Sequence, residues 1–298
     1  MVEFISCPCC ISQLLLFYVI AALFLIYLSN HIMMKYLPKH QIIQMIITII
    51  SNLINIIIIC ITISIGILIR YSSIRNYIFS KLMIILSIYP NSLDDIRCNK
   101  TGIFNLSGSI LEIGPGPGTN FRCWQNNINI TRWVGIEPNI YFKEQILQEA
   151  LKMNITFHID IIGFNQDGKL DNIDKIIESF DYVVGTHVLC SVDDMNSIFN
   201  LIRTSLKPFG IYYFLEHTIV YDINDDIYTY VLQQLLEPLI NIIGNGCRFK
   251  PLWEVINSNT QLPGFNVSLS FINAPVPLQF MIPHIYGYAI KGNSTITL

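Results

Sequence analysis

The sequence predicts an α/β domain with a doubly wound, largely parallel sheet, preceded by membrane helices at the N-terminal end. Two observations lead to this fold class. Residues 109–215 alternate short apolar runs with helical stretches, an order typical of a parallel sheet covered by helices. Although 13% of the whole chain is charged, residues 1–69 contain only three charged side chains, Glu3, Lys35 and Lys39. The apolar excess is therefore concentrated before the α/β domain.

Length and composition exclude several classes of protein. The chain has 298 residues, of which 52% are apolar, and its mean hydropathy is +0.49, so it is neither intrinsically disordered nor a small disulfide scaffold. A net charge of −3 offers no basic surface, and we expect no nucleic-acid partner. Among the eight cysteines only Cys7 and Cys10 have CxxC spacing, no second CxxC pair accompanies them, and no histidine lies at zinc-finger spacing. We therefore expect reduced thiols on the cytosolic side and no metal site.

Two apolar segments occupy the N-terminal region. Residues 11–28 carry no charge and are close to the minimum length of a membrane-spanning helix, and the longer uncharged segment 42–69 ends before Arg70. We interpret residues 1–70 as a membrane anchor with these two helices, which makes membrane lipid a partner of the chain. Residues 71–108 follow as an interfacial linker, because their first half mixes apolar residues with single basic ones.

The predicted strands and helices follow in order along residues 109–291, which we expect to form one domain before a short tail at 292–298. Strands are expected at residues 109–113, 132–136, 156–162, 180–185 and 211–215, and helices at 142–153 and 195–205. Two late strands are expected at 267–272 and 284–291, with prolines that break the chain around them.

A glycine-rich turn directly follows the first predicted strand. Gly114, Gly116 and Gly118 lie in the stretch Leu111–Asn120, at the carboxyl end of a strand, where α/β sheets bind their ligands. A dinucleotide fingerprint needs its third small residue at a position that is Thr119 here. The spacing therefore indicates a cofactor that need not place a pyrophosphate at a helix N-terminus. A plain turn is the alternative interpretation.

An acidic residue at the end of the second predicted strand strengthens the cofactor interpretation. Glu137 comes 23 residues after Gly114, and an acid at this position can accept hydrogen bonds from both hydroxyls of a ribose. A solvent-exposed loop acid is the alternative. Together with the glycine turn, Glu137 favours a cofactor that contains a nucleoside.

Further motifs make the chain similar to a known family. They are the runs Phe180–Val192, Leu206–His217, Gln233–Pro238, Gly246-Cys247 and Pro283–Lys291. With the glycine turn and Glu137, residues 109–291 resemble the membrane-anchored, methyltransferase-like thiol S-methyltransferases, a group of class I S-adenosylmethionine-dependent methyltransferases. The resemblance implies a seven-stranded Rossmann-like sheet with its last strand antiparallel, S-adenosyl-L-methionine as cofactor, and small alkyl thiols as methyl acceptors.

The resemblance and the strand ends together give the candidate site residues. We expect the cofactor to be bound by Glu112, Gly114, Gly116, Gly118, Glu137, Asp160 and Thr186. Because a thiol becomes the nucleophile only after losing its proton, we also expect a proton acceptor at the ends of the fourth and fifth strands. The candidates are His217 first, since histidine accepts a proton near neutral pH, and then Glu216 and His187. A histidine that only shapes the pocket is the alternative, and Cys190 is expected to pack beside it.

Three features depart from the family's pattern. The family's turn usually reads Gly-Cys-Gly-Thr-Gly, whereas Pro115 and Pro117 fill both gaps here, and each proline removes an N–H from the loop. Phe209 replaces the usual glycine before the fifth strand, and His187 stands where an aliphatic residue is common. These departures bear on the substrate more than on the fold.

Two other functions fit the sequence. One is a membrane methyltransferase that acts on an oxygen or carbon atom of a quinone, a lipid or another apolar small molecule. The other is a non-catalytic lipid-surface protein with a degenerate cofactor pocket, which the two prolines favour and which Glu112 and Glu137 oppose. For the enzyme we expect the endoplasmic reticulum membrane, with the domain facing the cytosol where the cofactor is made, or a lipid droplet.

Overall fold

The chain divides into two compact units. They are Met1–Arg75 and Asn76–Leu298. The computed structural model describes residues 41–88, 93–163, 176–257 and 264–292. The expected apolar helix at 11–28 and nearly all of the expected tail lie outside the described residues.

The first unit contains the long helix α2 (Gln41–Arg70), which covers the expected apolar segment 42–69. Isoleucine and leucine side chains are exposed around much of its circumference. They are Ile50, Leu53, Ile54, Ile56, Ile57, Ile59, Ile61 and Ile63. Within the described ranges, none of the helices combines the length and the apolar character that a membrane crossing requires.

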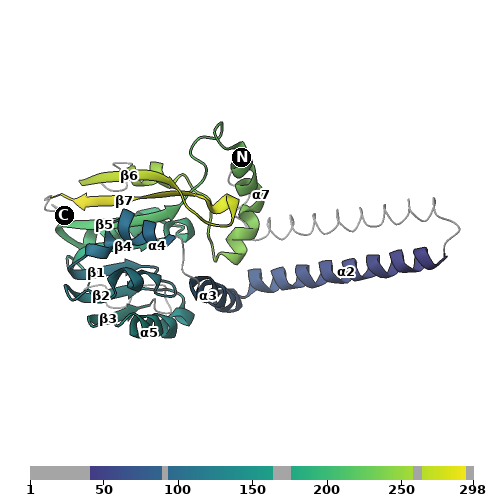
Figure 1. Cartoon of the computed structure of the whole chain (residues 1–298), viewed down its shortest axis with the longest axis horizontal. Coiled ribbons are helices and arrows are strands. Elements are labelled where there is room, and N and C mark those ends of the chain that lie inside the picture. Colours follow the sequence, from purple (N-terminus) through teal and green to yellow (C-terminus); the bar gives the residue numbers. More distant parts are fainter. Residues whose placement is uncertain (1–40, 89–92, 164–175, 258–263, 293–298) are drawn as a thin grey trace. The chain divides into compact units, whose positions relative to one another are not determined.

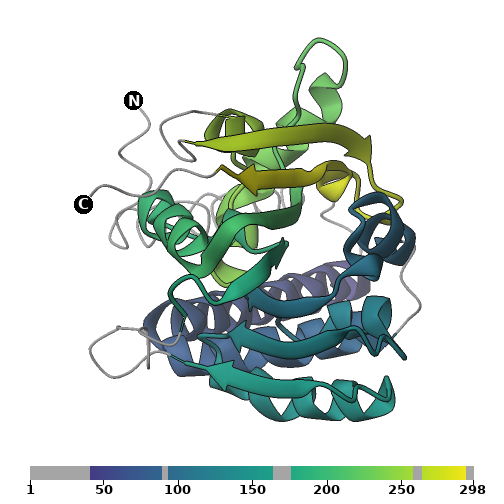
Figure 2. The same cartoon turned by 90° about the vertical axis from the view of Figure 1, so that its left-hand side faces the viewer.

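The second unit is built around a seven-stranded sheet with the order β3-β2-β1-β4-β5-β7-β6, which can be followed in Figures 1 and 2. The strands are β1 (Gly108–Ile113), β2 (Ile130–Ile136), β3 (His158–Ile162), β4 (Phe180–Thr186), β5 (Leu206–His217), β6 (Phe265–Asn273) and β7 (Pro283–Lys291). Strands β1 to β5 pair in parallel, whereas β7 is antiparallel to both β5 and β6. The predicted sheet, with its antiparallel last strand, is therefore confirmed.

Two apolar layers cover the two faces of the sheet, because neighbouring residues of a strand point to opposite faces. Leu111 of β1 belongs to a buried cluster that includes side chains of α6 (Met195–Ser205) and α8 (Leu252–Asn257). Ile110, the residue before it, belongs to another cluster that includes side chains of α5 (Lys143–Lys152). Helices therefore cover both faces, and strands that are buried on both faces are apolar almost throughout.

The helix α7 (Ile227–Ile243) was not predicted from the sequence. It contains Pro238, a residue type that usually ends or kinks a helix, and its N-terminus is capped by Asp226, whose carboxylate accepts the N–H of Thr229. Helices α5 and α6 occupy their expected positions. The remaining helical segments are α4 (Leu93–Asp95) and the short turns Ile96–Lys100, Ile103–Asn105, Thr119–Trp124, Ile140–Phe142, Leu189–Ser191 and Gln279–Met281.

The part of the expected linker that belongs to the second unit packs on the loop after β2. In the helix α3 (Ser72–Ile88), the ring of Phe79 makes an edge-on contact with Phe142, with centroids 6.0 Å apart. The backbone carbonyl of Asn76 accepts a hydrogen bond from Asn139 Nδ2 at 2.9 Å. Contacts of the domain therefore begin earlier in the chain than the expected residue 109.

One pair of cysteines corrects the expectation of reduced thiols. Cys98 and Cys123 form a disulfide, with Cα atoms 5.1 Å apart. The bond joins the turn that precedes β1 to the turn that follows the glycine loop, two segments that the fold brings together although 25 residues separate them. Sequence spacing alone could not show this proximity. Cys60, Cys190 and Cys247 are free thiols within the part of the chain that the structure describes.

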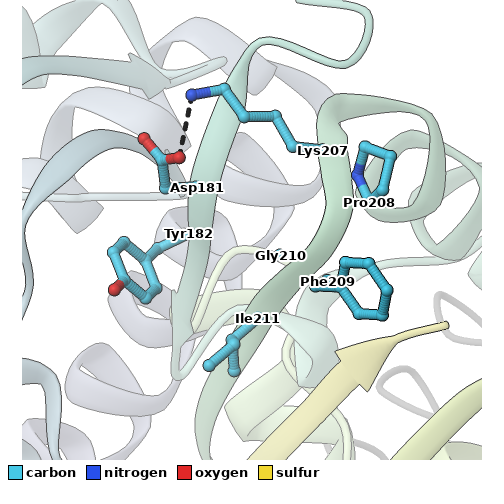
Figure 3. Close-up of a pocket in the computed structure, with 7 residues that line it drawn as sticks. All are labelled: Asp181, Tyr182, Lys207, Pro208, Phe209, Gly210 and Ile211. Carbon is cyan, nitrogen blue, oxygen red and sulfur yellow. Dashed lines mark hydrogen bonds and ion pairs between the residues drawn. The ribbon is translucent and has the colours of Figure 1, made fainter. Parts of the chain in front are cut away.

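A small pocket opens at the amino end of β5, where its lining includes Asp181, Lys207 and Phe209 (Figure 3). Lys207 Nζ lies 2.8 Å from Asp181 Oδ1, and Asp181 also accepts the backbone N–H of Ser109 at 2.8 Å. Phe209, where the related family usually has glycine, takes a left-handed backbone with φ of +63°. Because α/β sheets bind ligands at the opposite, carboxyl edge, we assign this pocket no ligand.

Gly287 belongs to the motif run Pro283–Lys291. It lies where β7 and β6 approach too closely for a side chain. A Cβ at this position would lie 2.0 Å from the backbone oxygen of Ser268 in β6. Gly287→Ala should therefore lower the free energy of unfolding by at least about 1–3 kcal/mol, as overpacking does. Urea denaturation measures the change. Gly163→Ala, where a Cβ would meet no atom within 4 Å, is the control, and equal losses in both variants would contradict the explanation.

Candidate functional site

The glycine loop forms the first wall of the site, at the carboxyl end of β1. Gly114, Gly116 and Gly118 all have a positive φ, of 61°, 54° and 82°, which glycine adopts without strain. A Cβ at Gly114 would lie 2.7 Å from Val188 Cγ2, whereas a Cβ at Gly116 would meet no atom within 4 Å. The loop is thus packed tightly at its base and has open space at its middle glycine.

The loop has no free backbone donor between residues 114 and 118. The N–H of Gly114 donates to the carbonyl of Ile136 at 2.9 Å, and the N–H of Gly118 donates to the carbonyl of Pro115 at 3.0 Å. The N–H of Gly116 donates to Glu137 Oε2 at 2.9 Å, and prolines have no N–H to offer. A pyrophosphate would find no donor in this stretch, which agrees with the interpretation of the glycine spacing.

Glu137 joins the end of β2 to the glycine loop. Its Oε2 accepts the Gly116 N–H, and its Oε1 accepts the N–H of Asn139 at 2.8 Å. The side chain is only 7% exposed, and burial raises the pKa of this carboxyl to about 7, against the lowering effect of the two hydrogen bonds. Glu137 and the glycine loop, both of which the sequence assigns to the cofactor, are therefore in direct contact.

Glu112 lies beneath the loop and organises it from within the core. Its Oε1 accepts a hydrogen bond from Asn120 Nδ2, and its Oε2 accepts one from Trp133 Nε1, both at 2.8 Å. Asn120 Nδ2 also donates to Thr186 Oγ1 at 3.0 Å. Glu112 and Thr186 therefore share Asn120, a residue that the sequence interpretation missed because nothing in its spacing marks it. Both act through Asn120 on the turn that follows the loop.

Asp160 does not join this group. It pairs with Val134 in the middle of β2, its side chain is exposed, and its nearest ionic partner is His158 at 3.8 Å. The N–H of Glu137 donates to the carbonyl of Ile162, so residues at the level of Glu137 come after Ile162, at the end of β3. The structure thus places Asp160 along the strand and away from the loop that it was expected to face.

The three expected proton acceptors do meet at the ends of β4 and β5. Glu216 Oε1 accepts the backbone N–H groups of Val188 at 3.0 Å and Leu189 at 3.1 Å, so it positions the segment after β4. Burial, and then the nearby Cys190, raise the pKa of Glu216 to about 8. His217 is 3% exposed and its Nε2 lies 3.1 Å from Cys247 Sγ. The ring of His217 is therefore held inside a cluster of side chains.

A third histidine, His284, belongs to this group, and the sequence analysis did not identify it as a site residue. His284 of β7 lies opposite His217 in the sheet register, and its Nε2 is 3.1 Å from Nε2 of His187. Burial lowers the pKa of His284 to about 4, and burial together with His284 holds the pKa of His187 well below its ordinary value. Both rings are thus neutral at pH 7. Antiparallel pairing brings the amino end of β7 to this edge, which the sequence could not show.

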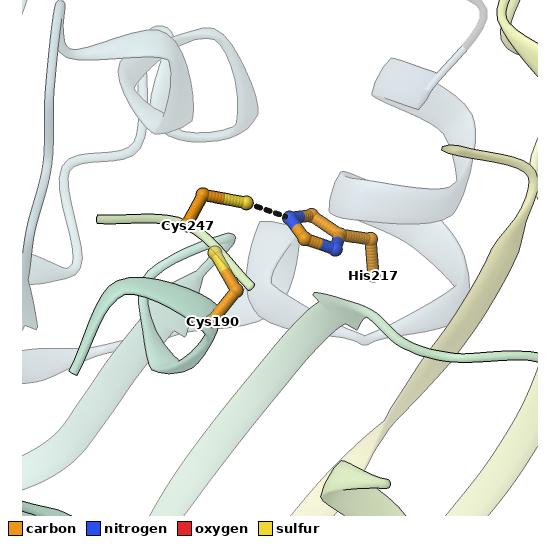
Figure 4. Close-up of side chains that lie close together, drawn as sticks. All are labelled: Cys190, His217 and Cys247. Carbon is orange, nitrogen blue, oxygen red and sulfur yellow. Dashed lines mark hydrogen bonds between the residues drawn. The ribbon is translucent and has the colours of Figure 1, made fainter. Parts of the chain in front are cut away.

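Two cysteines lie against the imidazole of His217 (Figure 4). Cys190 belongs to the turn after β4, as expected beside the site, and Cys247 follows α7. The pKa of the Cys190 thiol is held well below its ordinary value, chiefly because Cys247 donates a hydrogen bond to its sulfur, and next because His217 lies beside it. The partner thiol, Cys247, has its pKa raised by the same contact and by burial.

Comparison with known proteins finds methyltransferases among those that the chain is similar to. Residues 92–237 match a family model described as a methyltransferase domain. The chain is 29% identical over 186 residues to thiol S-methyltransferase TMT1A of Homo sapiens, which covers 61% of this chain and 70% of that protein. It is also 29% identical over 195 residues to thiol S-methyltransferase TMT1B of Homo sapiens, which covers 64% and 74% respectively.

Solved structures with a similar fold include two of low sequence identity. A SAM-dependent methyltransferase from Methanosarcina mazei is 15% identical with a TM-score of 0.47, over 66% of this chain and 98% of that chain. The [4+2]-cyclase SpnF is 13% identical with a TM-score of 0.47, over 65% and 80%.

Ionisation of Glu112 should make the stability of the protein depend on pH. Burial raises the pKa of Glu112 from 4.5 to about 7, so folding favours the protonated carboxyl. The contribution of the protonated Glu112 carboxyl to the free energy of unfolding is fully present below about pH 4.5. It is lost as the pH rises through about 7. Glu112→Gln stays neutral, so between pH 5 and pH 8 it should gain roughly 2–3 kcal/mol relative to the wild type.

Urea denaturation across this pH range measures the difference. Glu254→Gln, at an exposed position, is the matched control and should follow the wild type. A Glu112→Gln protein whose stability falls with pH as steeply as the wild type would show that the carboxylate is ionised in the folded state without cost.

Proposed function

We propose that the chain is a class I S-adenosylmethionine-dependent methyltransferase that transfers the methyl group to small alkyl thiols. The observation that supports the thiol acceptor is the pair of curated relatives named thiol S-methyltransferases, together with the motif runs at residues 180–192 and 283–291. The cluster of His187, His217 and His284 at the ends of β4, β5 and β7 lies where a methyl acceptor would approach the cofactor.

The cofactor is S-adenosyl-L-methionine, and the residues of the loop fit it. The open space at Gly116 leaves the loop backbone accessible to a cofactor, and Glu137 at the end of β2 would bind the ribose hydroxyls. The donor-free backbone between residues 114 and 118 suits a cofactor without phosphates. When bound, the cofactor supplies a methyl group on a positively charged sulfur.

The protein's contribution to methyl transfer is mainly positioning. An in-line displacement needs the thiolate sulfur, the methyl carbon and the leaving sulfur in one line, and a fixed geometry provides most of the rate gain. Glu216 acts here as a positioning residue, because its carboxylate orients the Val188 and Leu189 amides and thereby the segment that carries Cys190. His187 and His217 form the imidazole wall of the proposed acceptor site.

Removing the carboxylate of Glu137 should weaken cofactor binding. Glu137→Ala loses the bonds to the ribose and the hydrogen bond that holds Gly116, and we expect a loss of roughly 1.5–3 kcal/mol in binding free energy, the range for hydrogen bonds to a charged group. Calorimetry measures it. Asp160→Ala is the control and should bind as the wild type does, because its side chain points away from the loop. Wild-type protein that binds NAD and ignores S-adenosyl-L-methionine would overturn the cofactor assignment.

The thiol acceptor is tested by a panel of substrates. Purified protein with isotopically labelled S-adenosyl-L-methionine should produce methylated alkyl thiols, and a quinol panel tested in parallel should stay unlabelled. Labelled quinol without labelled thiol would replace the proposed acceptor by an oxygen or carbon nucleophile. Glu216→Ala should lower the rate, because it removes the oxygen that accepts the Val188 and Leu189 N–H groups and so releases the segment after β4.

We also propose that the enzyme is held at a membrane, most simply that of the endoplasmic reticulum, with the methyltransferase domain facing the cytosol. Apolar side chains that are exposed on a helix favour contact with other apolar matter, such as a membrane surface, and the exposed isoleucines of α2 support the proposal. An apolar acceptor would also concentrate in the bilayer next to the enzyme.

Truncation tests the membrane location. Protein that lacks residues 1–70 should leave the membrane fraction, whereas protein that lacks only residues 1–30 should stay, because the segment that forms α2 remains. Protease protection in sealed microsomes reports the side, and digestion of the domain from outside is expected. Release of the protein by removal of residues 1–30 alone would show that the first segment is the anchor.

A further inference from the structure

A compact group of soft ligand atoms lies outside the cofactor loop. The thiol sulfurs of Cys190 and Cys247 and a ring nitrogen of His217 all lie within 4.8 Å of one another, and Figure 4 shows the three side chains turned toward a common point. Tetrahedral zinc, with about 2.3 Å to sulfur and about 2.0–2.1 Å to nitrogen, places its ligand atoms roughly 3.5–3.8 Å apart. The distance of 3.1 Å between Cys247 Sγ and His217 Nε2 is already close to this spacing.

Backbone hydrogen bonds hold the three segments of this group in place. The N–H of Arg248 donates to the carbonyl of Cys190 at 3.1 Å, and Thr218 Oγ1 donates to the carbonyl of Lys250 at 2.7 Å. Each ligand-bearing segment is thus tied to the next, so the donor atoms are positioned by the fold itself. Preorganised donors of this kind bind a metal with little loss of conformational freedom.

The three side chains are buried, and a bound cation is compatible with this burial. The exposed fractions of Cys190, His217 and Cys247 are 2%, 3% and 7%. Two thiolates balance the charge of one divalent cation, so the occupied centre is neutral and its burial costs less than that of an isolated charge. Thiolates and imidazole are the ligands that select zinc among the common divalent ions.

We propose that Cys190, His217 and Cys247 bind one Zn²⁺ ion, with both cysteines as thiolates and His217 through Nε2. The cation would displace the thiol protons and replace the contact between Cys247 and His217 by two metal–ligand bonds. Three protein ligands leave one tetrahedral position for an exogenous ligand such as water. The centre would lock the segment after α7 onto the ends of β4 and β5, next to the proposed acceptor site.

Metal analysis of the full chain, purified in detergent without chelators, tests the site. Elemental mass spectrometry should find about one zinc per chain in the wild type, and the double variant Cys190→Ser, Cys247→Ser should lose it. Cys60→Ser, which removes the exposed thiol of α2, is the matched control and should retain it. A wild type without zinc that also fails to take up added Zn²⁺, or a double variant that retains zinc, would overturn the proposal.

Two measurements on the wild-type chain avoid dependence on the variants' folding. Replacement by Co²⁺ should give visible absorption bands of tetrahedral cobalt and a thiolate charge-transfer band. Alkylation mapped by peptide mass should show Cys190 and Cys247 protected until a chelator removes the metal, while Cys60 reacts equally in both states. Absence of the cobalt bands, or a disulfide between Cys190 and Cys247 in the intact protein, would overturn the site.

Failure of the zinc site is distinguishable from failure of the proposed function. Calorimetry with S-adenosyl-L-methionine and the thiol assay are run on the same preparations as the metal analysis. Thiol methylation by protein that cannot bind zinc would overturn the metal site and leave the acceptor assignment standing. Zinc bound as described, in a protein that methylates no thiol, would overturn the acceptor assignment and leave the metal site standing.

Discussion

The carboxylate of Glu137 accepts the N–H of Gly116 on one side and the N–H of Asn139 on the other, and the shape of the cofactor site depends on this contact. Glu112 ties β1 to Asn120 and Trp133 in the same manner. Glu216 ties β5 to the segment after β4. Three buried carboxyls at neighbouring strand ends therefore hold the loops that surround the site.

This arrangement has an electrostatic consequence. Burial raises the pKa of Glu112 and Glu137 to about 7 and that of Glu216 to about 8, so each ionised carboxyl costs roughly 3–5 kcal/mol relative to water. An opposite charge nearby lowers such a pKa and offsets this cost. A cofactor with a positively charged sulfur is therefore a ligand whose charge these carboxyls favour.

Local sequence pattern accounts for much of the fold and for one half of the site. The alternation of apolar runs located β1, β2, β4 and β5, and the glycine turn with Glu137 located the cofactor loop, because these features are close together in the chain. The missed residues depend on distant pairing instead. His284 reaches the site only through the antiparallel register of β7, and Cys247 only through the unpredicted helix α7. The disulfide of Cys98 and Cys123 and the partners of Asn120 likewise follow from packing that spacing does not encode.

The two prolines of the loop, which from the sequence alone favour a degenerate pocket, have another meaning in the structure. A proline harms a loop where its missing N–H was needed as a donor, but here the three glycine N–H groups already bond within the protein. Pro115 even contributes through its carbonyl, which accepts the N–H of Gly118. Fixed φ angles at residues 115 and 117 reduce the freedom of the unfolded chain and so favour the folded loop. The prolines therefore stiffen a loop that has no free N–H donor for a phosphate. The argument for a non-catalytic protein thereby loses its main support.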